Sequence, residues 1–137
     1  MQPRDRAVFL ALIVAQAAHS LEEYLFGLYE VFAPARFASN LVSTNSALGF
    51  AALNLLIVAF GVWCYVYRVR PDRPSARYWV WPWVLVSLGN GIAHSTLAVV
   101  RGGYFPGVVT APLLFALAAF IGLTLVRSSR SSRWAAV

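Results

Sequence analysis

Four long apolar runs alternate with short polar segments along the chain. They cover about residues 7–28, 45–67, 79–100 and 108–126. Each run is close to the ~20 residues that a helix rising ~1.5 Å per residue needs to cross the hydrocarbon core of a bilayer. The segments between them carry the prolines and paired glycines that are typical of loops. The pattern predicts an all-α fold, a four-helix transmembrane bundle, with residues 1–137 forming a single transmembrane domain.

The composition supports the membrane interpretation. Of the 137 residues, 60% are hydrophobic and 12% are charged, whereas charged residues make up about 25% of a typical soluble domain. We therefore expect an integral membrane protein. The single cysteine, Cys64, lies inside the second apolar run, so it can form no intrachain disulfide, and its expected role is packing.

The arginines predict how the bundle is oriented. All eleven basic residues are Arg, against five acids, for a net charge of +6. They flank the apolar runs instead of forming one face, which argues against a nucleic-acid partner. Four spans would place nine of them on one side of the membrane: Arg4, Arg6, Arg68, Arg70, Arg73, Arg77, Arg127, Arg130 and Arg133. The other side has Arg36 and Arg101, so the positive-inside rule places both termini in the cytoplasm.

The start of the chain has two interpretations. The segment "MQPRDR", a short apolar run and "AQA" at 15–17 resemble a cleavable secretory signal. Because residues 1–17 are part of the chain, we expect the segment to be retained as the first span. The Arg-only, Ala- and Val-rich composition indicates a GC-rich bacterial source, and hence a multi-pass protein of the bacterial inner (cytoplasmic) membrane.

Ionisable residues lie where hydrocarbon is expected. In the first run, His19, Glu22 and Glu23 have the spacing i, i+3, i+4, which places them on one helix face. In the third run, Asn90 and His94 are one turn apart at a matching depth. By the orientation above, both groups fall in the outer half of the membrane. We expect them to meet inside the bundle.

The cost of burying these groups favours a functional role. An acid at the centre of a transmembrane helix costs about 2.5–3.5 kcal/mol, whereas a Leu, Ile, Phe or Val gains about 0.3–0.6 kcal/mol. Two glutamates would cancel most of the first helix's gain, so a proton, a histidine or a metal ion must neutralise them. The alternative is hydrogen bonding that only holds helices together. This structural role fits the amide of Asn54, in the second run, better than it fits acids that lie beside a histidine.

The third loop, "GGYFPGVVT", lies on the same side as these polar groups. Its Tyr104, Pro106 and Thr110 can therefore cap the cavity that the helices would form. The loop and the two polar helices together predict one site.

Three motifs carry a family resemblance: "HSLEE" at 19–23, "NGIAH" at 90–94 and "YFPG" at 104–107. Their order resembles that of the HXXEE family of small bacterial integral membrane proteins, which has His-x-x-Glu-Glu, then Asn-x-x-x-His and Tyr-x-Pro-Gly. The resemblance implies an enzyme whose reaction has not been identified. The family's motif positions correspond here to His19, Glu22, Glu23, Asn90, His94, Tyr104, Pro106 and Gly107.

The leading hypothesis is a membrane enzyme of isomerase, cyclase or hydrolase type, acting on a lipid-soluble substrate by general acid/base chemistry. Asn90 would orient His94 or the substrate. The catalytic candidates are His19, Glu22, Glu23, Asn90 and His94. The substrate-binding candidates are Asn54, Tyr104, Pro106 and Gly107.

Other versions keep the same residues. A divalent metal, zinc or iron, could be held by His19, Glu22, Glu23 and His94. A haem between His19 and His94 would be crowded by the glutamates. A proton-coupled carrier would need more room than four short spans give, unless the chain forms a homo-oligomer. A scaffold is the remaining class. The expected partners are membrane lipids and a hydrophobic small-molecule substrate.

Overall fold

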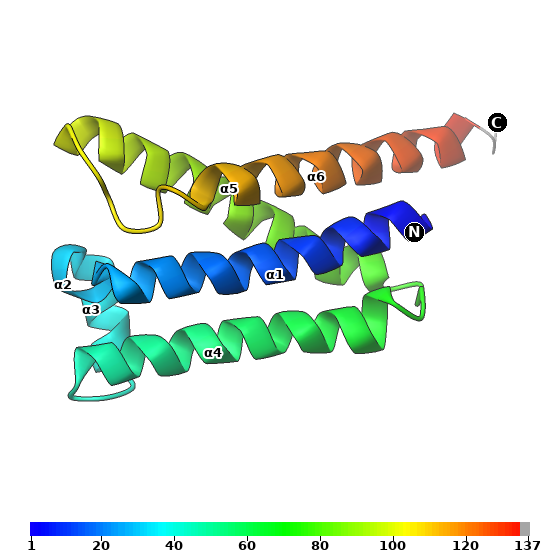
Figure 1. Ribbon diagram of the computed structural model, residues 1–137. Coiled ribbons are helices and arrows are strands. Elements are labelled where there is room, and N and C mark those ends of the chain that lie inside the picture. Colours follow the sequence, from blue (N-terminus) through cyan, green and yellow to red (C-terminus); the bar gives the residue numbers. More distant parts are fainter. Residues whose placement is uncertain (135–137) are drawn as a thin grey trace.

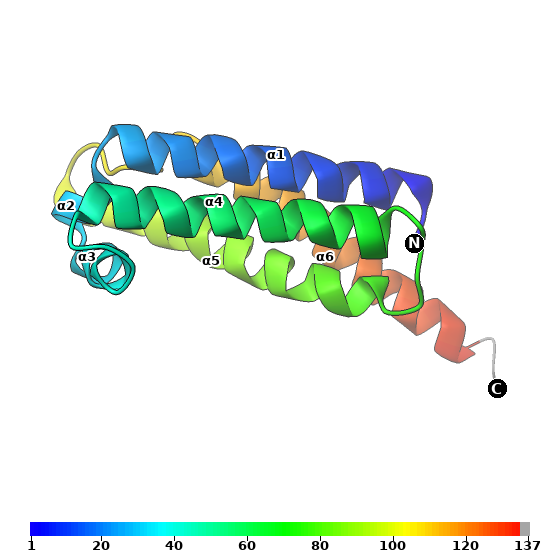
Figure 2. The same ribbon diagram turned by 90° about the horizontal axis from the view of Figure 1, so that it is seen from below.

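The computed structural model describes residues 1–134, with side chains for residues 1–128, and this part of the chain is all-helical. The elements are α1 (Pro3–Leu25), α2 (Leu28–Val31), α3 (Ala33–Asn40), α4 (Ser46–Cys64), the π-helical turn η1 (Tyr65–Val69), α5 (Ala76–Arg101) and α6 (Ala111–Trp134). The four long helices form a bundle, and α2 and α3 cover one end of it (Figures 1 and 2).

Four helices in the described residues are long and apolar enough to cross a membrane. They are Pro3–Leu25, Ser46–Val69, Ala76–Arg101 and Ala111–Ser128. The prediction of four membrane-spanning helices is confirmed as far as helix length and apolar composition go. The chain starts at the end of the bundle where α4 connects to α5 and where α6 ends, whereas α2, α3 and the α5–α6 loop lie at the opposite end (Figure 1). The side chains of Arg130 and Arg133, which count toward the predicted orientation, are not among those that the structure describes.

The boundaries differ from the predicted runs in several places, and helix α1 is Pro3–Leu25 where the pattern predicts residues 7–28. The first connecting segment is not an open loop but contains α2 and α3, because Pro34 lies in the first turn of α3, where no helical N–H is needed. Helix α5 begins at Ala76, before the expected start at 79. Helix α6 begins at Ala111 instead of 108, because the preceding residues form a turn that binds α1.

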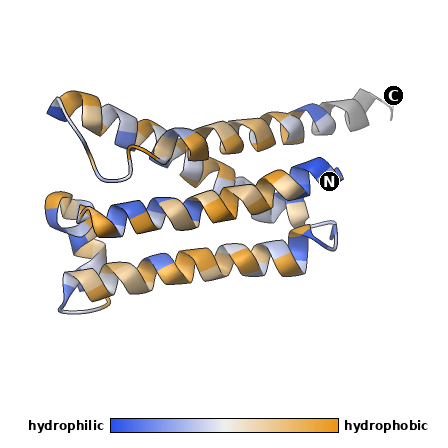
Figure 3. Cartoon of the chain, in the orientation of Figure 1, coloured by the Kyte–Doolittle hydropathy of each residue, from blue (hydrophilic) through white to orange (hydrophobic). Residues whose placement is uncertain are grey.

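Helix α1 is the central helix of the bundle. Half of its apolar window is buried, compared with 22–28% in the other three spans. Toward the end where the chain starts, its Phe9, Leu12 and Ile13 pack with Trp83 and other apolar side chains of η1, α5 and α6. Its C-terminal half carries hydrophilic positions, and others lie on α4 and α5 (Figure 3). The central position shelters these polar side chains from lipid.

The outward faces of the long helices are apolar. Leu55 on α4 is 71% exposed and Val99 on α5 is 81% exposed. Large apolar surfaces of this kind are rare on soluble proteins but match the hydrocarbon of a bilayer. The protein is therefore a multi-pass membrane protein.

Candidate functional site

Two histidines and a glutamate from α1 and α5 converge in the interior. Glu23 Oε1 lies 3.3 Å from His19 Nε2 and 3.1 Å from His94 Nε2. The two imidazole rings meet edge to face with centroids 4.8 Å apart. His19 is fully buried, and Glu23 and His94 are each 7% exposed. The structure thus brings together three residues from the first and second motifs.

The α5–α6 loop fixes the proton position on His94. His94 Nδ1 lies 2.7 Å from the carbonyl oxygen of Pro106. A carbonyl oxygen can only accept, so Nδ1 carries the proton and donates it to Pro106. In neutral His94, the lone pair is then on Nε2, which faces Glu23.

A threonine fixes His19 in the same way. His19 Nδ1 lies 2.8 Å from Thr110 Oγ1, and this hydroxyl donates to Glu22 Oε2 at 2.6 Å. Because its only proton is committed to Glu22, Thr110 must accept from His19 Nδ1. In neutral His19, Nε2 therefore also carries a lone pair. This buried Nε2 forms no hydrogen bond with the described residues, although Glu23 is near.

Glu22 faces the loop and not the histidine pair. Its Oε1 accepts hydrogen bonds from the Tyr104 hydroxyl and from the backbone N–H groups of Gly107 and Val109. Its Oε2 accepts from the backbone N–H and the hydroxyl of Thr110. Five donors satisfy a carboxylate ion without a metal or a buried cation. Glu22 thus anchors the loop to α1.

Gly107 lies against both histidines. Its φ of +93° is a conformation that L-residues with side chains rarely adopt. A Cβ at this position would lie 2.6 Å from His94 Nδ1 and 2.8 Å from His19 Cε1. Both the backbone angle and the space therefore require glycine, so that the loop can lie directly over the two rings.

Tyr104 closes the loop at its exposed edge, where its side chain is 50% exposed. Burial, followed by the hydrogen bond to Glu22 and the charge of that carboxylate, raises the pKa of Tyr104 to about 12. The phenol therefore stays protonated at neutral pH and keeps donating to Glu22.

A cavity of about 270 Å³ adjoins the cluster. Most of its wall is apolar, formed by Leu28, Ala35, Ala38, Phe50, Leu53, Ile57 and Val86. The polar part of the wall consists of Gln16, Glu23, Asn54 and Asn90. Glu23 is thus shared by the cavity and the histidine cluster. Asn90 is placed at the cavity wall.

Asn54 and Gln16 join a hydrogen-bonded chain along this wall. Gln16 Nε2 donates to Ser20 Oγ at 3.3 Å, and Ser20 Oγ donates to Asn54 Oδ1 at 2.6 Å. Asn54 Nδ2 donates to the carbonyl oxygen of Phe50. Asn54 therefore links α1 to α4, as interhelical hydrogen bonding predicts, and also lines the cavity.

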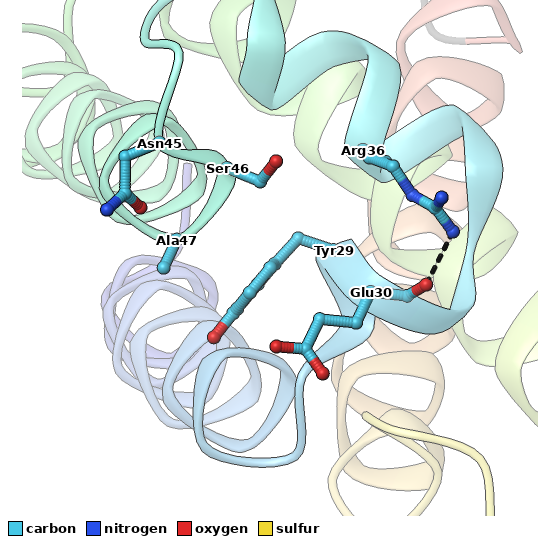
Figure 4. Close-up of a pocket in the computed structure, with 6 residues that line it drawn as sticks. All are labelled: Tyr29, Glu30, Arg36, Asn45, Ser46 and Ala47. Carbon is cyan, nitrogen blue, oxygen red and sulfur yellow. Dashed lines mark hydrogen bonds between the residues drawn. The ribbon is translucent and has the colours of Figure 1, made fainter.

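A second hollow lies at the α2–α3 end of the bundle, lined by Tyr29, Glu30, Arg36, Asn45, Ser46 and Ala47 (Figure 4). The Arg36 guanidinium donates there to the backbone oxygen of Glu30, while the Glu30 carboxylate points away from it. None of the residues predicted for the site lines this hollow.

Two contacts in the site are not predicted by the sequence pattern. Thr110 belongs to the predicted cap, and its hydroxyl also bridges His19 and Glu22. The hydrogen bond from Ser20 to Asn54 is the other, although a hydroxyl beside His19 in an apolar helix indicates an interhelical partner.

The fold and the cluster define a small multi-pass membrane protein with a buried His–Glu–His site under a loop. Residues 10–121 match the family described as "Protein of unknown function with HXXEE motif". The chain belongs to this family, as its three motifs predict. No curated protein and no solved structure matches the chain.

Proposed function

We propose that the protein is an integral membrane enzyme that acts on a lipid-soluble substrate at the cluster of His19, Glu23 and His94. One observation carries the proposal: the Glu23 carboxylate lies between two histidine nitrogens and also forms part of an apolar cavity wall. A reactive group buried for packing alone would not need access to a cavity.

The cavity favours an apolar substrate with a small polar group. Its aliphatic and aromatic wall suits a hydrocarbon chain or ring, whereas Asn54 and Asn90 provide hydrogen-bonding amides beside Glu23. Ile57 and Val86, which line the cavity from α4 and α5, are among the exposed residues of those helices. A substrate dissolved in the bilayer could therefore enter between these two helices.

Proton transfer is the chemistry that these residues supply directly. A proton shared between Glu23 and His94, whose atoms are 3.1 Å apart, can be given to or taken from a substrate in the cavity. The Nδ1 hydrogen bonds to Thr110 and Pro106 hold each ring in one orientation. We further propose cytoplasmic termini in a bacterial inner membrane, which places the site in the outer half.

Two rival functions fit the geometry less well. A haem between His19 and His94 would need a flat slot between the rings, but the rings touch edge to face and Gly107 packs against both. A proton-coupled carrier would need a polar route across the bundle. Phe9, Leu12 and Ile13 form an apolar core on one side of the cluster.

The test compares lipids made in cells that carry different versions of the protein. A strain lacking the gene would express the wild type, Glu23→Gln or Glu30→Gln at equal levels in the membrane. Glu30→Gln is the matched control, because Glu30 is an exposed acid outside the cluster.

Untargeted mass spectrometry of the extracted lipids is the readout. We expect at least one lipid-soluble compound to be consumed or formed with the wild type and Glu30→Gln but not with Glu23→Gln. Identical lipid profiles for the wild type and Glu23→Gln would overturn the proposal.

A further inference from the structure

The three atoms that converge in the cluster are all hydrogen-bond acceptors in its neutral-histidine form. His19 and His94 each use the Nδ1 proton elsewhere, on Thr110 and Pro106. Both Nε2 lone pairs therefore face the same carboxylate oxygen of Glu23. Three electron pairs that face one another in a buried site repel unless a cation lies among them.

We propose that His19 Nε2, His94 Nε2 and Glu23 Oε1 bind one divalent transition-metal ion of the zinc or iron(II) class. The three donor atoms lie within 4.8 Å of one another. Bonds of about 2.0–2.2 Å at tetrahedral to octahedral angles place neighbouring donors about 2.8–3.6 Å apart. The separations of 3.1 and 3.3 Å from Glu23 Oε1 to the two nitrogens fall in this range. The two nitrogens lie within 4.8 Å of each other and must also come within this range for one ion to bind all three atoms.

The surrounding contacts are those that a metal site needs. A metal-binding histidine usually donates its other N–H to a carbonyl oxygen or into a carboxylate network, which fixes the ring and the tautomer. His94 donates to Pro106, and His19 donates to Thr110, which in turn donates to Glu22. The α5–α6 loop provides both of these outer contacts. If the site only held a shared proton, one histidine Nε2 with a lone pair would be enough. A metal ion instead requires a lone pair on the Nε2 of both histidines.

The donor set indicates the class of ion. Two imidazoles and one carboxylate suit zinc and iron(II), whereas magnesium prefers oxygen ligands. Glu22 is not a ligand in this proposal, because five other donors already satisfy its carboxylate. Three protein ligands leave a coordination position for water or substrate, and Glu23 lies at the cavity wall.

Metal content of the purified protein tests the site without any substrate. The full chain in detergent would be stripped with a chelator, freed of chelator, incubated with Zn²⁺, with Fe²⁺ under anaerobic conditions or with Mg²⁺, and desalted. We expect about one equivalent of zinc or iron per chain by elemental analysis, and less than about a tenth of an equivalent of magnesium. A wild type that retains less than about a tenth of an equivalent of either transition metal overturns the proposal.

Variants separate ligands from supporting residues. Glu23→Gln and His94→Ala should lose the ion, whereas Glu30→Gln should bind like the wild type. Glu22→Gln should bind about 10–100-fold more weakly, because it weakens the support of His19. His94→Cys supplies another metal ligand and should recover zinc binding, which excludes misfolding as the cause of the loss in His94→Ala. Equal zinc binding by the wild type and Glu23→Gln also overturns the assignment.

The proposal rests on the site of the proposed function and replaces the proton shared by Glu23 and His94 with the ion, but it can fail separately from that function. If lipid turnover requires Glu23 although the protein binds no metal, acid/base catalysis is supported and the metal site is wrong. If the protein binds one equivalent of metal but no lipid is turned over, the metal site is supported and the proposed enzymatic function is wrong.

Discussion

The imidazole rings of His19 and His94 meet edge to face at a centroid distance of 4.8 Å, and the backbone of Gly107 packs against both of them. This contact explains why the three motifs occur together in one chain. The first and second motifs contribute one ring each, and the third contributes a loop that can approach them only because it has no side chain at Gly107. The loop therefore belongs to the site and does not merely connect α5 to α6.

Replacing Gly107 by Ala should destabilise the protein and disturb both histidines. The φ of +93° would strain the new residue, and its Cβ would press on His94. We expect a loss of about 2–4 kcal/mol in the free energy of unfolding, from strain and overpacking together. Equilibrium unfolding in mixed detergent micelles measures it.

Gly103→Ala is the matched control for this substitution. Gly103 lies in the same loop, but a Cβ there would meet nothing within 4 Å. If both alanine variants unfold at the same denaturant concentration, the role assigned to Gly107 is wrong.

The sequence predicts the helices and the meeting of α1 with α5, but not the difference between the two adjacent acids. Polarity and helical spacing are local features, so the matching depths of His19 and His94 can be estimated from the start of each run. Glu22 and Glu23 lie about 100° apart around the helix, which is close enough to share one face in a sequence pattern. Only the folded loop distinguishes them, because it supplies five donors to Glu22 and leaves Glu23 to the histidines.

Backbone groups were the other part that the sequence could not predict. The acceptor for His94 is the carbonyl oxygen of Pro106, and three donors to Glu22 are the N–H groups of Gly107, Val109 and Thr110. Every residue has such groups, so residue types do not reveal which of them a site uses. The motif "YFPG" indicated the right loop, but not that its main chain would make these contacts.

Replacing Thr110 by Val should release the orientation of His19. Valine has nearly the same shape but lacks the hydroxyl that accepts from His19 and donates to Glu22. The lost bonds leave a buried N–H without its partner, so we expect a loss of about 1–3 kcal/mol in unfolding free energy. Nitrogen NMR of the histidine rings should show His19 no longer held as one tautomer. Thr110→Ser keeps the hydroxyl and should behave like the wild type; a serine variant as impaired as the valine variant would contradict the bridge.

The raised pKa of Tyr104 predicts a pH-dependent contribution to stability. The pKa of this phenol is raised from 10.0 to about 12 in the folded protein. The folded state therefore favours the protonated form, and this contribution is complete below about pH 10 and is lost as the pH rises toward 12. This contribution should be small, because half of the side chain is exposed.

A pH titration followed by the absorbance of ionised tyrosine tests the raised pKa. The wild type should show one more tyrosine that ionises at high pH than Tyr104→Phe does. Tyr78→Phe, which removes an exposed phenol in α5, serves as the control; the same late step missing from both variants would refute the assignment.

The link between Ser20 and Asn54 should contribute modestly to stability. Ser20 Oγ donates to Asn54 Oδ1 across α1 and α4 at 2.6 Å. Such bonds between membrane helices average about 0.6 kcal/mol, so Ser20→Ala should lower the free energy of unfolding by about that amount. Ser87→Ala is a suitable comparison, because the buried Ser87 hydroxyl has no hydrogen-bond partner among the described residues. A larger loss in Ser87→Ala than in Ser20→Ala would show that the link contributes little.

The adjacent glutamates should respond differently to the same isosteric change. Glu22→Gln places an amide N–H₂ group among donors that need an acceptor, including Tyr104 and Thr110. Hydrogen bonds to a charged group are worth about 1.5–3 kcal/mol each, so we expect Glu22→Gln to lose at least about 2 kcal/mol of stability. Glu23→Gln instead gives its amide a nitrogen acceptor on His19 or His94 and removes a buried charge, so in metal-free buffer its stability should equal or exceed that of the metal-free wild type. Unfolding measurements on the two variants, made in the same detergent, test the contrast directly. If Glu23→Gln proves the less stable of the two, Glu23 and not Glu22 holds the loop to α1, and the roles assigned here to the two carboxylates must be exchanged.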